Sequence, residues 1–101
     1  MLKDIFNIQA EVWLYPGENA NWHFVSVPKE ISAGIRERFG GRSKGWGSLP
    51  VTVTIGRMTW DTSIFPDKKS AAYLLPLKAA VRVTEGIRVG EKIAFLIRMR
   101  V

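Results

Sequence analysis

The sequence contains no cysteine, and this absence excludes several kinds of site at once. Without thiols the chain has no disulfide framework, no thiolate zinc site and no cysteine nucleophile. The single histidine, His23, has no second histidine or cysteine with which to share a metal ion, and scattered carboxylates do not form such a site alone. We therefore expect no metal centre, and we expect His23 to be an exposed or hydrogen-bonded structural residue.

Long apolar runs are also missing. No run approaches the roughly 20 residues that a membrane helix needs. Asp4 and Asn7 interrupt the N-terminal segment at the place where a signal peptide needs an unbroken apolar core. These features predict a cytoplasmic protein that has no membrane partner.

Motifs for catalysis and for cofactor binding are weak. Residues 41–45 have the G-x-S-x-G spacing of a nucleophile elbow, which requires a preceding strand, a following helix and a later histidine base. Here the predicted order is helix and then strand, and His23 comes earlier in the chain. The same segment lacks the spacing of a phosphate-binding P-loop. We therefore expect no cofactor and no enzymatic activity.

The composition is that of a globular protein. Of the 101 residues, 47% are apolar and 24% are charged, which predicts a single domain over residues 1–101 with one hydrophobic core. Fifteen Lys and Arg against nine Asp and Glu give a net charge of +6. Such a surface either attracts phosphate-rich partners or simply keeps a small domain in solution.

Alternation of apolar and polar residues predicts six strands, over residues 4–15, 22–27, 49–55, 58–65, 71–75 and 92–101. Helical spacing predicts short helices over residues 29–39 and 77–85, ended by Gly40 and Gly86. At the end of the first strand, Trp13 and Tyr15 either cap the rim of a barrel or form a stacking surface. Many strands without regular β-α-β alternation predict a small, mainly antiparallel β-barrel.

Several of these segments resemble one known family. The similar stretches are TSIFP at residues 62–66, YLLPLKAAVR at 73–82, WHFVSVP at 22–28, and the Gly-Trp-Gly-Ser of residues 45–48 before Pro50 and Val51. The chain thereby resembles a family of small β-barrel proteins catalogued as a domain of unknown function, often fused to an OmpD-associated, bacteriocin-protection type domain. The resemblance implies a double-split β-barrel, a fold shared with dimeric DNA-binding transcription factors of the antitoxin type. It thus implies a possible homodimer.

The strongest candidate site lies in residues 59–82, where hydroxyl, aromatic and cationic side chains are mixed. Lys78 and Arg82 are spaced i, i+4 on the predicted second helix and would share one of its faces. Two such cations could hold an anionic group by charge-assisted hydrogen bonds. Alternatively, Asp61 or Asp67 pairs with them and fastens the strand to the helix. The candidate ligand-binding residues are Trp60, Thr62, Ser63, Tyr73, Lys78 and Arg82.

A second candidate lies around the glycine-rich segment of residues 40–48, which has little reason to be ordered without a partner. Cations and an aromatic side chain there could hold a phosphate backbone and stack a base. The alternative is a solvated loop whose Trp46 packs back on the barrel. The candidate nucleic-acid-binding residues are Arg36, Arg38, Arg42, Lys44 and Trp46.

These observations support three hypotheses about function. The leading one is a non-catalytic binding module for a small anionic ligand or a protein partner, with its site between the central strand and the second helix. The alternative is a barrel that binds nucleic acid through its basic glycine-rich loop. An enzyme is the weakest of the three, because the sequence offers no convincing pair of base and nucleophile.

Overall fold

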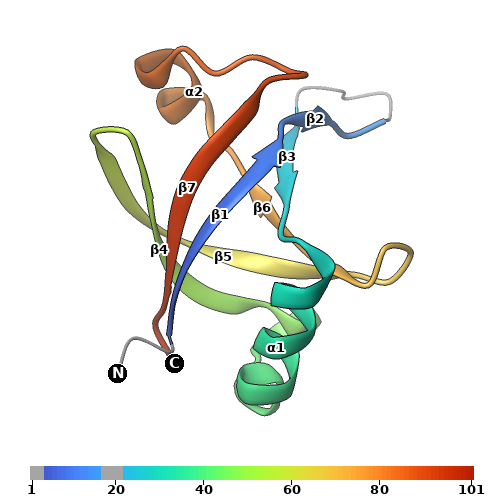
Figure 1. The fold of residues 1–101 in the computed structure, drawn as a ribbon. Helices are drawn as coiled ribbons and strands as arrows, with labels where there is room; N and C mark the ends of the chain where they lie inside the picture. The colour runs from blue at the N-terminus through green and yellow to red at the C-terminus, as the bar shows by residue number, and fades with distance from the viewer. Residues whose placement is uncertain (1–3, 17–21) are drawn as a thin grey trace.

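The fold is known from a computed structural model, which describes residues 4–16 and 22–101. In these ranges the chain forms seven strands, two α-helices and two short 3-10 turns (Figure 1). The elements are β1 Ile5–Glu11, β2 Trp13–Leu14, β3 His23–Ser26, α1 Lys29–Phe39, η1 Gly40–Arg42, η2 Gly45–Gly47, β4 Leu49–Ile55, β5 Met58–Asp67, β6 Ala72–Pro76, α2 Ala79–Glu85 and β7 Lys92–Met99. The prediction of a small, mainly β, barrel-like fold with two helices is confirmed.

All strand pairs are antiparallel, in the order β1-β7-β4-β5-β6-β3-β2. The long strand β5 connects the two halves of this sheet. Its first part pairs with β4 from Met58 to Ile64, and its last part pairs with β6 from Phe65 to Asp67. The sheet therefore curves into a half-barrel, with α1 and α2 at opposite ends (Figure 1).

The structure describes seven strands where about six were predicted, because the first predicted strand is divided at Val12. The Val12 N–H donates to the Glu91 carbonyl at 2.8 Å, and the Val12 carbonyl accepts from the Gly90 N–H at 2.8 Å. These bonds hold the chain beside the start of β7, after which it turns toward β3 as β2. Val12 is fully buried at this bend.

The buried faces follow the alternation in the sequence. Every second residue of β4 is buried, and so are Phe95, Ile97 and Met99 of β7. Helix α1 adds Ile35 and Phe39 to the same core. Helix α2 adds Val81 and ends at Gly86, which has a positive φ of 64°. The alternation that predicted β4 and β7 and the predicted stop of the second helix at Gly86 are confirmed.

The glycine-rich segment is more regular than the sequence predicted. The Lys44 N–H donates to the Ser48 carbonyl at 2.8 Å, and the Gly47 N–H donates to the Lys44 carbonyl at 2.9 Å. Gly47 has a φ of 76°, and a Cβ added there would lie 2.9 Å from Cγ of Pro66. Only glycine fits this close approach without strain, so the turn is seated against β5.

In the part of the chain that the structure describes, no helix is long and apolar enough to cross a membrane.

Candidate functional site

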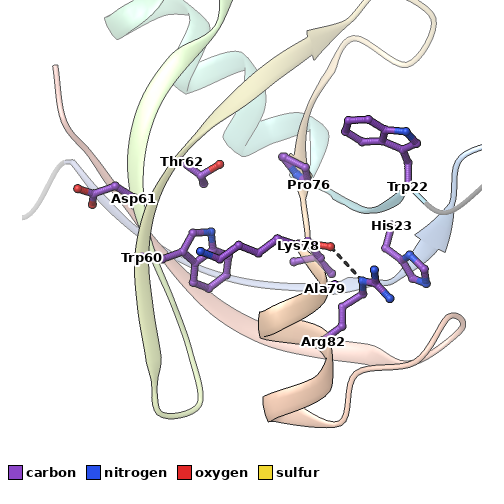
Figure 2. A pocket seen from close by; sticks show the side chains of 10 residues that line it. Trp22, His23, Trp60, Asp61, Thr62, Pro76, Lys78, Ala79 and Arg82 are labelled. Atoms are coloured by element: carbon purple, nitrogen blue, oxygen red, sulfur yellow. Dashed lines mark hydrogen bonds between the residues drawn. The ribbon is translucent and has the colours of Figure 1, made fainter.

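A pocket of about 350 Å³ opens between the middle of β5 and the segment in which β6 leads into α2 (Figure 2). The start of β3 forms its third side. Its lining therefore comes from segments that are far apart in the sequence. The lining residues are Trp22, His23, Trp60, Asp61, Thr62, Pro76, Leu77, Lys78, Ala79 and Arg82. We call it the seam pocket.

Four of the six predicted ligand-binding residues line the seam pocket. Trp60 and Thr62 are two residues apart on β5, so their side chains lie on the same face of that strand. Lys78 precedes α2, and Arg82 lies in the last turn of this short helix, four residues later. The predicted juxtaposition of the central strand with the second helix is thus present (Figure 2).

Arg82 is held at one nitrogen and directed into the pocket. Its Nε donates to the Leu77 carbonyl at 3.1 Å, a bond that is partly buried (Figure 2). This bond fixes the plane of the guanidinium, whose end lies on the His23 side of the pocket. Lys78 is exposed at the mouth. Across residues 4–16 and 22–101, neither cation forms an ion pair with a carboxylate.

The predicted internal pairing of these cations with aspartates is therefore not formed. The Asp61 side chain points away from the pocket (Figure 2). Its Oδ1 accepts a hydrogen bond from the Thr52 hydroxyl at 2.7 Å and lies 3.7 Å from Nε of Arg100. Asp67 accepts a hydrogen bond from the Ser70 hydroxyl at 2.7 Å.

The remaining two predicted residues lie outside the seam pocket. Ser63 alternates with Thr62 and therefore faces the other side of β5. Tyr73 is buried in the core, with 2% of its surface exposed. Burial raises the pKa of the Tyr73 phenol, and the nearby Arg36 guanidinium partly opposes that rise. The guanidinium carbon of Arg36 lies 5.3 Å from the centre of the Tyr73 ring.

The sequence did not identify the β3 side of the pocket. Trp22 and His23 reach it because β3 pairs with β6, which places Phe24 opposite Pro76. Only this strand partnership brings the segment to Lys78 and Arg82. Trp22, which precedes β3, is 60% exposed, and no local pattern in the sequence indicated this.

The five predicted nucleic-acid-binding residues are not gathered in one pocket. Arg36 donates from Nη2 to the Ala71 carbonyl at 2.9 Å, and the Arg38 guanidinium carbon lies 4.7 Å from the centre of the Phe39 ring. Arg42 and Lys44 are exposed. Trp46 is 94% exposed, so the alternative in which it packs back on the barrel is wrong.

No group of three or more His, Asp or Glu residues that could hold a metal ion occurs in the described ranges. The seam pocket is lined instead by two cations, an imidazole, a hydroxyl, two indoles and the Asp61 carboxylate, which points away. Such a set is suited to an anionic group attached to a flat or apolar body, because the cations bind the charge and the indoles cover the body.

A family model described as a domain of unknown function (DUF1905) matches residues 9–97, which include every residue of the seam pocket. No curated protein matches the chain. Because the family model covers most of the sequence, the chain belongs to the DUF1905 family.

Proposed function

We propose that the protein is a non-catalytic binding module that holds a small anionic ligand in the seam pocket. The observation that carries this proposal is the pair of cations, Lys78 and Arg82, which line one pocket together with Trp60 and Thr62 and have no carboxylate partner in the described chain. A cation that is not paired internally keeps its hydrogen-bonding groups for a ligand.

Arg82 supplies directional binding. Since its Nε is engaged by the Leu77 carbonyl, its two terminal nitrogens present a fixed edge to the pocket. A carboxylate or phosphate can accept hydrogen bonds from that edge, and Lys78 adds a second charge with freer geometry. Holding one partner in place before binding reduces the entropy that a ligand must lose.

The size and the walls of the pocket restrict the ligand further. A volume of about 350 Å³ is near the lower end of the range for small-molecule sites, so the ligand is small. Trp60 and Trp22 offer flat apolar surfaces on two sides. We therefore expect an aromatic or otherwise planar acid, or a single phosphorylated nucleoside, rather than an extended chain.

Binding is favoured over catalysis by the orientation of the one carboxylate at the pocket. The Asp61 side chain points to the opposite side of β5, where Thr52 and Arg100 hold it. A general base must lie within hydrogen-bonding reach of the atom from which it takes a proton. Asp61 has no such access to a ligand beside Lys78 and Arg82.

The test is native mass spectrometry of the protein as purified from cells, followed by titration calorimetry with benzoate, inorganic phosphate and adenosine monophosphate. At least one anion should bind, and Lys78→Ala should weaken its affinity by about tenfold, as expected for loss of one charge-assisted hydrogen bond. Arg88→Ala is the matched control, because it removes an exposed cation outside the pocket. Equal weakening in both variants, or no binding by any of the three anions and no retained anionic ligand, would contradict the proposal.

A further inference from the structure

A second, larger cleft of about 740 Å³ lies away from Lys78 and Arg82, and the proposed function makes no use of it. It is bounded by the end of β2, the η2 turn and the β5–β6 hairpin. Its lining is mainly aromatic and apolar with two adjacent lysines, namely Trp13, Tyr15, Pro16, Trp46, Phe65, Pro66, Asp67, Lys68, Lys69 and Leu74. We call it the aromatic cleft.

Trp46 is displayed in this cleft by a well-defined turn. It is 94% exposed, and its φ of 65° is in the left-handed region that bulky residues rarely adopt. The adjacent Gly47 lies against Pro66, and two backbone hydrogen bonds close the turn around Lys44. The chain thus holds a large apolar ring in water at a conformational cost, a combination that folding alone does not favour.

The other wall of the cleft belongs to a row of aromatic rings. Trp13 lies 6.2 Å from Tyr15 and 5.3 Å from Phe24, measured between ring centres. Phe24 in turn stacks with Trp22 at 6.2 Å and an interplanar angle of 12°. The Trp13 indole N–H donates to the Ser26 hydroxyl at 3.0 Å, which fixes the orientation of that ring.

Positive charge lines the β5–β6 edge of the aromatic cleft. Lys68 and Lys69 are both exposed at the tip of the β5–β6 hairpin. Asp67 is the one acidic residue of the lining, and its Oδ2 accepts a hydrogen bond from the Ser70 hydroxyl at 2.7 Å. The edge therefore has an excess of positive charge, in a chain whose net charge is +6.

We propose that the aromatic cleft binds a short single strand of nucleic acid. Unpaired bases stack on the rings of Trp46, Trp13 and Tyr15, and the phosphates contact Lys68 and Lys69. A duplex buries the faces of its bases, so it cannot use the rings. An acidic peptide would form ion pairs with the lysines, but its carboxylates provide no planar group that stacks on the exposed Trp46. This site differs from the glycine-rich arginine cluster predicted from the sequence, of which it includes only Trp46.

The test is fluorescence anisotropy with labelled twelve-nucleotide dT and rU strands and a twelve-base-pair duplex, at several salt concentrations. We expect single strands to bind at least tenfold more tightly than the duplex. Trp46→Ala should weaken single-strand binding by about tenfold, within the range for loss of one stacked base, and Trp46→Phe should restore most of it. Lys68→Ala/Lys69→Ala should make the salt slope about 1.4 less negative, because each phosphate contact on a single strand contributes roughly 0.7.

The charge-matched control is Arg88→Ala/Lys92→Ala, which removes two exposed cations outside the aromatic cleft and should leave the affinity within twofold. Three results would overturn the proposal: equal affinity for the duplex, equal losses in the control and in the lysine variant, or competition by polyglutamate as effective as competition by unlabelled dT. Failure of small anions to bind the seam pocket would leave this result unaffected, so the two proposals are tested separately.

Discussion

Helices α1 and α2 each place an arginine near one end of β6, and the two arginines have different surroundings. Arg36 of α1 uses a terminal nitrogen, Nη2, to bind the Ala71 carbonyl, and its guanidinium lies over the Tyr73 ring. Arg82 of α2 uses Nε for the Leu77 carbonyl, and its terminal nitrogens lie on the His23 side of the seam pocket (Figure 2).

This difference distinguishes an arginine that holds two parts of the protein together from an arginine that is available to bind a ligand. Arg36 connects α1 to Ala71, a non-glycine residue with a φ of 60° in the turn before β6. One of its terminal nitrogens is therefore used by the protein itself. Arg82 is oriented by one internal bond and keeps the edge that matches a carboxylate or phosphate. The following predictions test this contrast, beginning with the largest expected effect.

Among the contacts between α1 and the rest of the protein, the loss of the Ser32 hydroxyl should lower the stability most. It is fully buried, and its hydroxyl donates to the Val27 carbonyl at 3.0 Å and accepts from the Tyr73 N–H at 3.0 Å. Ser32→Ala leaves both backbone groups buried without this partner, which should lower the free energy of unfolding by about 2–4 kcal/mol. Urea denaturation measures the change. The control is Ser43→Ala at an exposed position, and a loss for Ser32→Ala no larger than for this control would show that Ser32 does not fasten α1.

Arg36→Ala should have a smaller effect on stability. It removes one exposed hydrogen bond and one cation–π contact, together about 1 kcal/mol at such a site. Thermal unfolding should reveal this loss, while anion binding in the seam pocket stays unchanged. A weaker anion affinity without a loss of stability would reverse the roles that we assign to the two arginines.

A pH-dependent loss of stability should follow from Tyr73. Because burial raises its pKa in the folded protein above the ordinary value of 10.0, folding favours the neutral phenol. The resulting stabilisation is complete below pH 10 and is lost as the pH rises through the folded-state pKa. Arg36→Ala should raise this pKa further, since Arg36 lowers it, and ultraviolet titration of the phenolate measures the shift. Tyr73→Phe should reduce the fall in stability above pH 10, and an unchanged fall would show that other groups cause it.

Lys78→Ala should have the smallest effect on folding. Its side chain is exposed and forms no ion pair in the described chain, so the free energy of unfolding should change by less than about 0.5 kcal/mol. Arg82→Ala should cost about 1 kcal/mol through loss of the bond to Leu77. Both variants should weaken anion binding more than they lower the melting temperature. If these two variants instead lost as much stability as Ser32→Ala, then Lys78 and Arg82 would hold α2 in place as Ser32 holds α1.

Much of the fold could be predicted, because alternation and helical spacing are local properties of the chain. The β4 strand, the hairpin at Gly56 and the buried face of β7 all follow from residues only a few positions apart. The bend at Val12 could not be predicted, because it depends on hydrogen bonds to Gly90 and Glu91. Continuous alternation of apolar and polar residues does not show at which residue the chain stops pairing with one strand and begins to pair with another.

The candidate site could be predicted in part. The sequence by itself determined that Trp60 and Thr62 share one face of a strand and that Lys78 and Arg82 are four residues apart, since both relations follow from backbone geometry. Only the tertiary structure decided that Trp22 and His23 join them, that Tyr73 is in the core, and that Trp46 faces solvent beside Lys68 and Lys69. These outcomes depend on strand partners and on the close approach of Gly47 to Pro66, which are contacts between distant residues and have no local signature.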